Sequence, residues 1–240
     1  MKIGEVHLGT TTRLIVPLVG KNQAELLREA KLAQQSAADL VEWRLDHLAT
    51  VLGLAQTVAI GRQLRSQCTK PLIATFRTLA EGGEQAISAE DYVALYRGLL
   101  DEGLCEALDV EGHWPDEVKS TLRKLAHQHG VPIICSAHHF QETPAIAVLQ
   151  ETLRTLAASG DIGKLAVMPK TPQDVLDLLT GTLTVSAETK QPLITMAMGD
   201  LGMISRIAGA NFGSVATFGS LAVASAPGQI PIETLATLIK

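Results

Sequence analysis

Short apolar runs recur eight times along this chain, and most of them carry an ionisable residue at one end. A charged group beside a buried strand is costly unless it is paired or performs chemistry. If the runs are neighbouring strands, their charged ends converge on one rim and form a polar pocket. The pattern therefore indicates an active site, and the residues concerned are Glu42, Arg44, Arg77, Asp109, His138, Lys164 and Arg206.

Strand-like and helix-like segments alternate along the whole sequence, as in repeated βα units. The expected strands are 14–19, 40–45, 72–76, 106–110, 131–137, 164–168, 193–198 and 214–218. The clearest expected helices are 22–37, 88–102, 115–129, 143–159 and 171–184. Eight such units in 240 residues favour a single (β/α)8 barrel, the TIM barrel, over a doubly wound open sheet, which usually has fewer strands at this length.

We therefore expect residues 1–240 to form one α/β barrel domain, with residues 1–12 covering its bottom. In such a barrel, side chains at the carboxyl ends of the strands line the active site. The ionisable residues named above lie at or near those ends.

Composition and local sequence exclude several classes of protein. A net charge of -5 and an aromatic content of 3% give no basis for binding nucleic acid. Residues 1–10 lack the apolar core of a signal peptide. The uncharged stretch 207–232 is rich in Ala and Gly and contains two prolines, so we expect no membrane span. Three widely spaced cysteines indicate free thiols in a reducing, cytoplasmic compartment.

Lys164 opens the run Lys-Leu-Ala-Val-Met-Pro at residues 164–169. Desolvation of an inward-facing lysine, together with nearby arginines, favours the free amine, which can attack a ketone. Alternatively, Lys164 caps the preceding helix or pairs with Asp161 at the bottom rim. The residues alone do not decide between these two interpretations.

His138 and His139 follow an apolar run and point to opposite faces of a strand, so at most one faces the barrel axis. A histidine in the pocket can act as general acid and base near neutral pH. A structural, hydrogen-bonded histidine is the alternative. A metal site is disfavoured because no second His or Cys has suitable ligand spacing on that face.

Three further sets of charged residues suit the binding of a polar ligand. Glu42, Arg44 and Asp46 are predicted to share one strand face, which suits a polyol or an oxyanion, or alternatively a structural ladder of ion pairs. Arg77 and Glu81 flank a loop that continues with two glycines. Arg206 precedes a Gly-rich stretch and can neutralise a carboxylate or phosphate, unless it is a surface arginine on a helix.

At these positions the chain closely resembles type I 3-dehydroquinate dehydratase, also called 3-dehydroquinase. The resemblance runs in order over nearly the whole chain. The matching segments are EWRLD (42–46), TFR (75–77), EGGE (81–84), His138 with Phe140, KLAVMP (164–169), ITMAM (194–198), ISR (204–206), FGSVATFG (212–219) and ASAPGQ (224–229).

The resemblance implies a dimeric (β/α)8 barrel with an N-terminal hairpin closing one end. It also implies dehydration of 3-dehydroquinate to 3-dehydroshikimate in the shikimate pathway of aromatic amino acid biosynthesis, without a metal or organic cofactor. Lys164 would form a Schiff base with the C3 ketone, and His138, oriented by Glu81, would move the C2 proton to the departing C1 hydroxyl in a syn elimination.

The same resemblance implies the residues that bind the substrate. Arg206 would bind the carboxylate, and Asp109 would lie behind the contact residues. The remaining contacts implied are Ser225 and Gln229 with polar groups, Glu42, Arg44 and Arg77 with ring hydroxyls, and Met196 and Met198 with the ring. The chain departs from the family's common pattern at Pro17, His139 and Gly163.

Two other functions fit parts of the sequence. A class I aldolase also uses a lysine imine on this barrel, and residues 213–219 resemble a phosphate loop. The arginines favour a carboxylated polyol over a sugar phosphate. A non-catalytic binding barrel has no positive support, because each matching catalytic position is filled.

Overall fold

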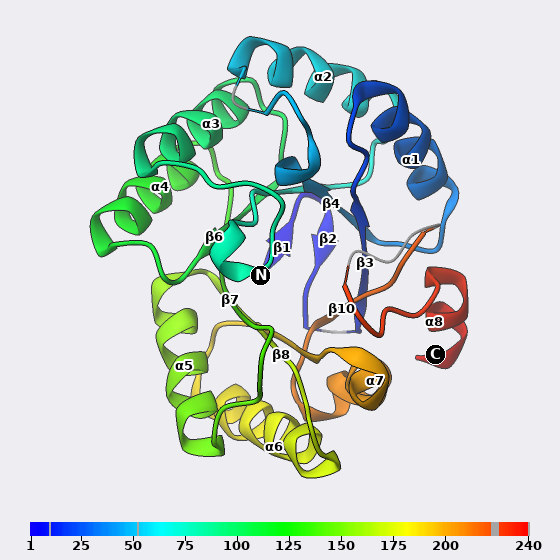
Figure 1. Ribbon diagram of the computed structural model, residues 1–240, viewed down its shortest axis with the longest axis vertical. Helices are drawn as coiled ribbons and strands as arrows, with labels where there is room; N and C mark the ends of the chain where they lie inside the picture. Colours follow the sequence, from blue (N-terminus) through cyan, green and yellow to red (C-terminus); the bar gives the residue numbers. More distant parts are fainter. Residues whose placement is uncertain (10, 52, 222–225, 240) are drawn as a thin grey trace.

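The computed structural model describes residues 1–9, 11–51, 53–221 and 226–239, and within them eight parallel strands form a barrel (Figure 1). Neighbouring strands pair in the order β10-β3-β4-β5-β6-β7-β8-β9. Leu193 of β9 bridges Ser214, and its carbonyl accepts the Val215 N–H at 2.8 Å, which closes the ring. The strands are β3 Arg13–Leu18, β4 Leu40–Arg44, β5 Leu72–Thr75, β6 Ala107–Glu111, β7 Ile133–His139, β8 Ile162–Val167, β9 Leu193–Ala197 and β10 Ala216–Phe218. The predicted (β/α)8 barrel is confirmed.

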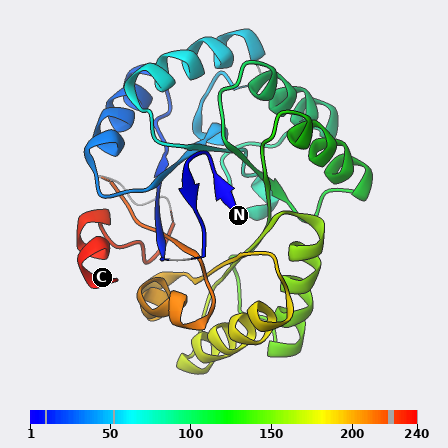
Figure 2. The same cartoon turned by 180° about the vertical axis from the view of Figure 1, so that it is seen from behind.

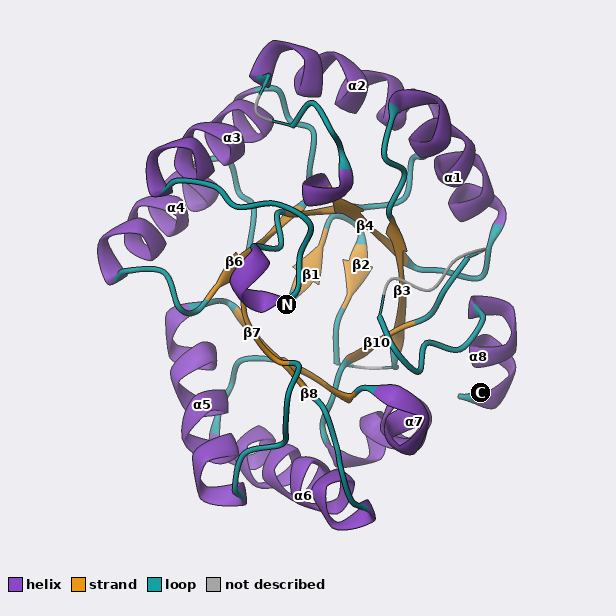
Figure 3. Cartoon of the chain, viewed as in Figure 1, coloured by secondary structure: helices purple, strands orange, loops and turns teal. Residues whose placement is uncertain are grey.

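The helices lie outside the strands (Figure 3). All five predicted helices are present, with ends that differ by a few residues. Local sequence sets some of these ends: the Ser88 side chain accepts from the Asp91 N–H, and Thr171 and Asp174 form a capping box. The helices are α1 Gln23–Gln35, α2 Leu54–Gln67, α3 Ala89–Asp101, α4 Asp116–Gln128, α5 Ile146–Ser159, α6 Pro172–Glu188, α7 Gly199–Ala208 and α8 Ile232–Leu238.

Alternation along the strands separates an inner from an outer surface. Leu40 and Ile162 belong to an apolar cluster inside the barrel, whereas Val41 and Trp43 pack outward against the helices. In the five neighbouring strands β4 to β8, a buried polar residue comes two positions after the inner apolar one, whereas Pro17, Met196 and Phe218 hold that position in β3, β9 and β10. The pairs are Leu40 with Glu42, Ile73 with Thr75, Ala107 with Asp109, Ile134 with Ser136, and Ile162 with Lys164. A polar layer therefore rests directly on an apolar floor.

This layering corrects two predicted positions. Lys164 was expected to open its strand and Asp109 to end one, but each is the third residue of its strand. The difference arises because β8 begins at Ile162, which pairs with Ile134, and because β6 continues to Glu111. Both side chains consequently lie one layer below the rim.

A short antiparallel hairpin, β1 Lys2–Ile3 and β2 Val6–His7, lies across the barrel end that faces the viewer in Figure 2. Ile3 is completely buried and joins the inner cluster with Ile15 and Ile194. The hairpin therefore covers the bottom, as expected for residues 1–12. It keeps water away from the apolar floor beneath the polar layer.

Among the described helices, none combines the length and apolar character needed to cross a bilayer. The assignment of residues 1–240 to one domain stays a prediction.

Because Ile3 is buried, we expect that shortening its side chain measurably lowers the stability of the protein. Ile3→Ala should lower the free energy of unfolding by about 2–4 kcal/mol in a denaturant titration, because it leaves a cavity in the floor. Ile204→Ala on α7 is the control, since Ile204 is 52% exposed and its truncation should cost less than about 0.5 kcal/mol. Equal effects of the two substitutions would show that the hairpin is not part of the core.

Candidate active site

One cavity at the carboxyl ends of the strands collects most of the predicted site residues. Of the seven ionisable residues, all but Asp109 line it, and Asp109 lies beneath, bonded to Lys164. Ser225 lies outside the described residues. The cavity is lined by Glu42, Arg44, Arg77, Gly82, His138, Phe140, Lys164, Ala166, Met196, Met198, Arg206, Phe218, Ala226 and Gln229.

Lys164 projects from β8 into this cavity and is only 4% exposed. Its Nζ donates to Asp109 Oδ2 at 2.8 Å and to Glu42 Oε1 at 3.4 Å, and lies 4.6 Å from the centroid of the Phe218 ring. The alternative of a cap or a bottom-rim ion pair is therefore wrong. Arginines lie nearby as expected, since Arg77 shares the Asp109 carboxylate with Lys164. The direct ion-pair partners of Lys164 are carboxylates.

Asp161, which was considered as an alternative partner of Lys164, contacts other groups. Its carboxylate contacts His127 Nε2 at 2.8 Å and accepts the Ile133 N–H.

His138, on the neighbouring strand β7, contacts Glu81 Oε2 through Nδ1 at 2.8 Å. Burial, and then the positive charges of Arg77 and Lys164, lower the pKa of His138 to about 4, against the opposing effect of Glu81. An ionised Glu81 can only accept hydrogen bonds, so Nδ1 carries the proton and Nε2 keeps its lone pair. At neutral pH His138 is therefore an uncharged imidazole with a basic nitrogen available.

Glu81 ends a short 3-10 helix, Leu79–Glu81, that follows β5. Gly82 comes next with φ +79°, a left-handed conformation that glycine adopts without strain, and a side chain there would collide with the Phe140 ring. Burial would raise the pKa of Glu81, but hydrogen bonds from His113 and His138 and the charge of Arg77 lower it to about 2. The carboxylate is thus ionised throughout the physiological range.

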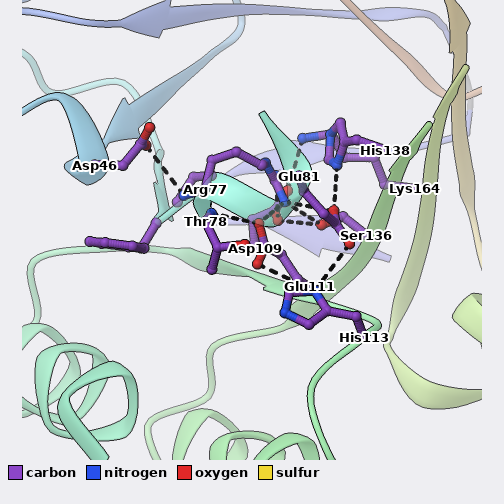
Figure 4. A network of polar contacts seen from close by, with 12 residues as sticks. Asp46, Arg77, Thr78, Glu81, Asp109, Glu111, His113, Ser136, His138 and Lys164 are labelled. Atoms are coloured by element: carbon purple, nitrogen blue, oxygen red, sulfur yellow. Dashed lines mark hydrogen bonds and ion pairs between the residues drawn. The ribbon is translucent and has the colours of Figure 1, made fainter. Parts of the chain in front are cut away.

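Arg77 connects Glu81 to the polar layer (Figure 4). Its Nη1 contacts Glu111 Oε1 at 2.9 Å and Ser136 Oγ at 3.0 Å, and its Nη2 donates to Asp109 Oδ1 at 2.8 Å. Burial would raise the pKa of Asp109, but Arg77 and Lys164 outweigh it and hold that pKa far below its usual range. The hydrogen bonds of the Arg77 guanidinium described above are all with protein groups. Its expected contact with a ring hydroxyl of the substrate therefore stays a prediction.

Arg44 and Asp46 form a bidentate pair with distances of 2.9 and 2.8 Å. Asp46 was expected on the same strand face as Arg44, but β4 ends at Arg44 and Asp46 lies in the 3-10 helix Leu45–His47. Its carboxylate also accepts the backbone N–H groups of Arg77 and Glu84. The pair therefore organises the loops at the rim, while Glu42 accepts from Thr75 Oγ1 and Lys164.

Arg206 lies in α7 and is 1% exposed, so the alternative of a surface arginine is wrong. Its guanidinium donates to the carbonyl oxygens of Phe218 and Pro227, and its buried Nε has no hydrogen-bond partner in the described structure. Burial lowers the pKa of Arg206 to about 10, which leaves it cationic at neutral pH. A buried cation whose side-chain hydrogen bonds with the described residues go to carbonyl oxygens is a suitable site for an anionic group.

Three residues at which the chain departs from the family's common pattern, His139, Gly163 and Pro17, have different surroundings in the structure. His139 pairs in register with Val167, which packs outward, so His139 is not on the cavity side. A side chain at Gly163 would meet the backbone of Ala157 in α5, which accounts for a small residue there. Pro17 pairs in register with Glu42 and offers no hydrogen-bond donor beside the polar layer.

Sequence reasoning missed several residues of this network. Ser136 and Glu111 each lie two positions from a predicted inward residue, so strand alternation could have identified them. Phe140 also lies two positions from His138, and both Phe140 and Phe218 stand in segments that match the family, but neither was assigned to the site. His113 lies beyond β6 in a loop, where side-chain direction cannot be inferred from periodicity. Within the described ranges, no group of three or more His, Cys, Asp or Glu residues is placed to hold a metal ion.

Comparisons with known proteins agree on one family. The family model for type I 3-dehydroquinase matches residues 14–240. A 3-dehydroquinate dehydratase of Salmonella agona (strain SL483) is 44% identical over 231 residues, covering 95% of this chain and 91% of that protein.

Solved structures give the same result. A type I 3-dehydroquinate dehydratase of Clostridium difficile, described with covalent modified comenic acid, is 35% identical with a TM-score of 0.95, covering 99% of this chain and 95% of that one. The 3-dehydroquinate dehydratase of Geobacillus kaustophilus HTA426 is 34% identical with a TM-score of 0.96, covering 100% and 94%.

The surroundings of His138 predict an acidic titration. In a ¹⁵N NMR titration its imidazole should change charge near pH 4, well below the ordinary value of 6.5. Because the folded-state pKa is the lower one, the neutral ring contributes stability above pH 6.5 that is lost as the pH falls toward 4. Glu81→Gln should lower the pKa of His138 further, since the carboxylate favours the imidazolium.

Glu102→Gln, which removes the partner of Arg62 at the surface, is the control and should leave the titration of His138 unchanged. A midpoint near 6.5, or a midpoint insensitive to Glu81→Gln, would contradict this account of the site.

Proposed function

Since this chain belongs to the type I 3-dehydroquinase family, we propose that it converts 3-dehydroquinate to 3-dehydroshikimate through a Schiff base on Lys164. The family assignment makes the chain a hydro-lyase. The observation that carries the proposed mechanism is the pairing, in one cavity, of a buried amine with an imidazole held by a carboxylate. That pairing supplies a nucleophile for the ketone and a base for the adjacent carbon.

The first step forms the imine. Lys164 Nζ gives up a proton, which exposes its lone pair, and adds to the C3 carbonyl. Protons pass to the carbinolamine oxygen, which leaves as water, so that the net change is from an ammonium and a ketone to a protonated imine and one water. Among the described residues that line the cavity, Lys164 is the lysine available for this step. Asp109 and Glu42 hold Nζ in place and balance a positive charge that persists from ammonium to iminium.

The second step eliminates the C1 hydroxyl. The iminium draws electrons from the ring, so His138 Nε2 can remove a C2 proton, and the C–H electron pair becomes the C2–C3 double bond of an enamine. The enamine then expels the C1 oxygen, which takes the proton from His138 and leaves as water. Hydrolysis of the product imine consumes one water and restores Lys164, so the net change is loss of one water.

The remaining cavity residues suit the binding of a carboxylated polyol. Arg206 is proposed to bind the substrate carboxylate, since it is buried and cationic and its hydrogen bonds with the described residues go to carbonyl oxygens. Glu42, Arg44 and Arg77 are proposed to contact hydroxyls, and Ser225 and Gln229 to contact polar groups. Met196 and Met198 give a flexible apolar wall for the ring.

Family membership also supports three broader proposals. We place the reaction in the shikimate pathway of aromatic amino acid biosynthesis, in the cytoplasm. The active form is proposed to be a homodimer of single-domain barrels. No metal or organic cofactor enters the proposed chemistry, because the lysine and the histidine between them supply each bond change.

The imine can be trapped by reduction. Borohydride added with 3-dehydroquinate or its product should fix a ligand-sized mass on the peptide that contains Lys164, as measured by mass spectrometry, because reduction converts the imine to a stable amine. Lys164→Ala should show neither adduct nor turnover. Lys170→Ala is the matched control and should show both.

His138→Gln separates the two steps. It should lower kcat by roughly 100- to 10,000-fold while still permitting the trapped adduct, because the amine is intact and the base is missing. An adduct on another lysine would overturn the role of Lys164. A His138→Gln enzyme as fast as the wild type would overturn the role of His138.

Arg206 predicts a defect in substrate binding. Arg206→Gln should raise KM by roughly 10- to 100-fold, because a charge-assisted bond to the carboxylate is lost. Arg206→Lys, which keeps the charge without the planar fork, should fall between this variant and the wild type. Arg154→Gln, at an exposed ion pair with Glu188, is the control. Steady-state kinetics giving an unchanged KM for Arg206→Gln would exclude the carboxylate contact.

A further inference from the structure

A second histidine contacts the carboxylate that orients His138. His113 lies in the loop between β6 and α4, and its Nδ1 is 3.2 Å from Glu81 Oε1 (Figure 4). The other oxygen of Glu81 contacts His138 Nδ1 at 2.8 Å. One carboxylate thus joins an imidazole in the cavity to an imidazole whose side chain is 40% exposed.

The charge of the Glu81 carboxylate determines the tautomers of the His113 and His138 rings. A carboxylate with a pKa of about 2 has no proton to donate at neutral pH, so each Nδ1 must be the donor. The bond from His113 occupies Oε1 and leaves Oε2 for His138. Because Glu81 ends a 3-10 helix before Gly82, this second contact restrains a side chain on a short segment.

The groups around His113 come from β6, from the segment after β5, from α4 and from its own loop. Glu111 of β6 places Oε2 at 3.6 Å from its Nδ1, and Arg77, after β5, binds both Glu111 and Glu81. From α4, Lys119 pairs with Asp116 and donates to the Gly112 carbonyl beside His113. The Trp114 ring stacks at 5.1 Å between centroids. The hydrogen bond to Glu81 raises the pKa of His113 above 6.5, against partial burial.

We propose that His113 is a positioning residue for the dehydration: it fixes Glu81, and its charge sets how strongly Glu81 supports the imidazolium of His138. The proposal rests on the role given above to His138 as the base. It extends the pair formed by His138 and Glu81 to a chain of three groups that reaches solvent.

The charge of His113 predicts the direction of a pH effect. When His113 is protonated, its positive charge beside Glu81 offsets part of the carboxylate's attraction for a protonated His138. As the pH rises through the pKa of His113, above 6.5, that positive charge disappears and His138 becomes a stronger base. Proton abstraction should therefore speed up by about two- to fivefold across this range, in keeping with the modest dependence of general base catalysis on basicity.

Two substitutions separate positioning from charge. His113→Asn keeps a nitrogen donor near Oε1 but cannot become charged, and His113→Leu removes both properties. His129→Asn is the matched control, because His129 is a partly exposed histidine whose Nε2 contacts Asp101 at 3.3 Å, on the C-terminal side of α4. The measurements are kcat and KM from pH 5 to 9 and a ¹⁵N NMR titration of His138.

We expect His113→Leu to lose about tenfold in kcat with KM nearly unchanged, because His113 does not line the cavity. His113→Asn should keep near-wild-type kcat above pH 8, lose the rise of kcat above pH 6.5, and raise the pKa of His138 above about 4. His129→Asn should change none of these.

A His113→Asn enzyme with the wild-type pH profile and an unmoved His138 titration would overturn the role of charge, even if His113→Leu does not fold. A folded His113→Leu enzyme with the wild-type kcat would overturn the proposal that His113 positions Glu81. Borohydride trapping on Lys164, run alongside, shows separately whether the proposed imine chemistry itself holds.

Discussion

The carboxylate of Asp109 holds two cations at the centre of the barrel, and the rest of the site depends on it. It contacts Lys164 on one oxygen and Arg77 on the other, each at 2.8 Å. All three groups are almost wholly removed from water, where isolated charges are expensive. Each charge is tolerable only because the others are present, so a lysine can remain inside a barrel whose floor is apolar.

The same interaction also helps to position His138. Arg77, placed by Asp109 and Glu111, also lies 3.5 Å from Glu81, which holds His138. The amine and the imidazole are therefore linked through shared ions as well as by their neighbouring strands. Their relative position is set by pairing in register, where Ser136 faces Lys164 and His138 faces Ala166.

Much of this arrangement was predictable from sequence. The alternation of βα units indicated the barrel, and the charged residues beside apolar runs identified Lys164 and His138. The depth of each side chain inside the barrel was not predictable. Strand ends inferred from apolar runs are uncertain by about two residues, and two residues along a strand separate one layer of inward-facing side chains from the next. The family resemblance placed Asp109 behind the substrate contacts, and it does lie outside the cavity lining, directly under Lys164. The apolar runs alone did not give this depth.

Loops set the other limit on prediction. Asp46 was assigned to a strand face by alternation, but the chain leaves the sheet at Arg44, and alternation carries no information beyond that point. His113 was not identified for the same reason. Its contact with Glu81 depends on the path of the β6–α4 loop, which only the coordinates give.

A base with a pKa of about 4 is weak for removing a carbon-bound proton at neutral pH, but the charges at this site change during the proposed reaction. Before abstraction, positive charge resides on the iminium of Lys164, next to Asp109, and suppresses protonation of His138. Abstraction leaves the enamine nitrogen neutral and puts the charge on His138, where Glu81 is already in contact. The site thus disfavours the imidazolium in the resting state and stabilises it as it forms. Interactions of this kind, which strengthen only along the reaction coordinate, raise kcat and not simply substrate affinity.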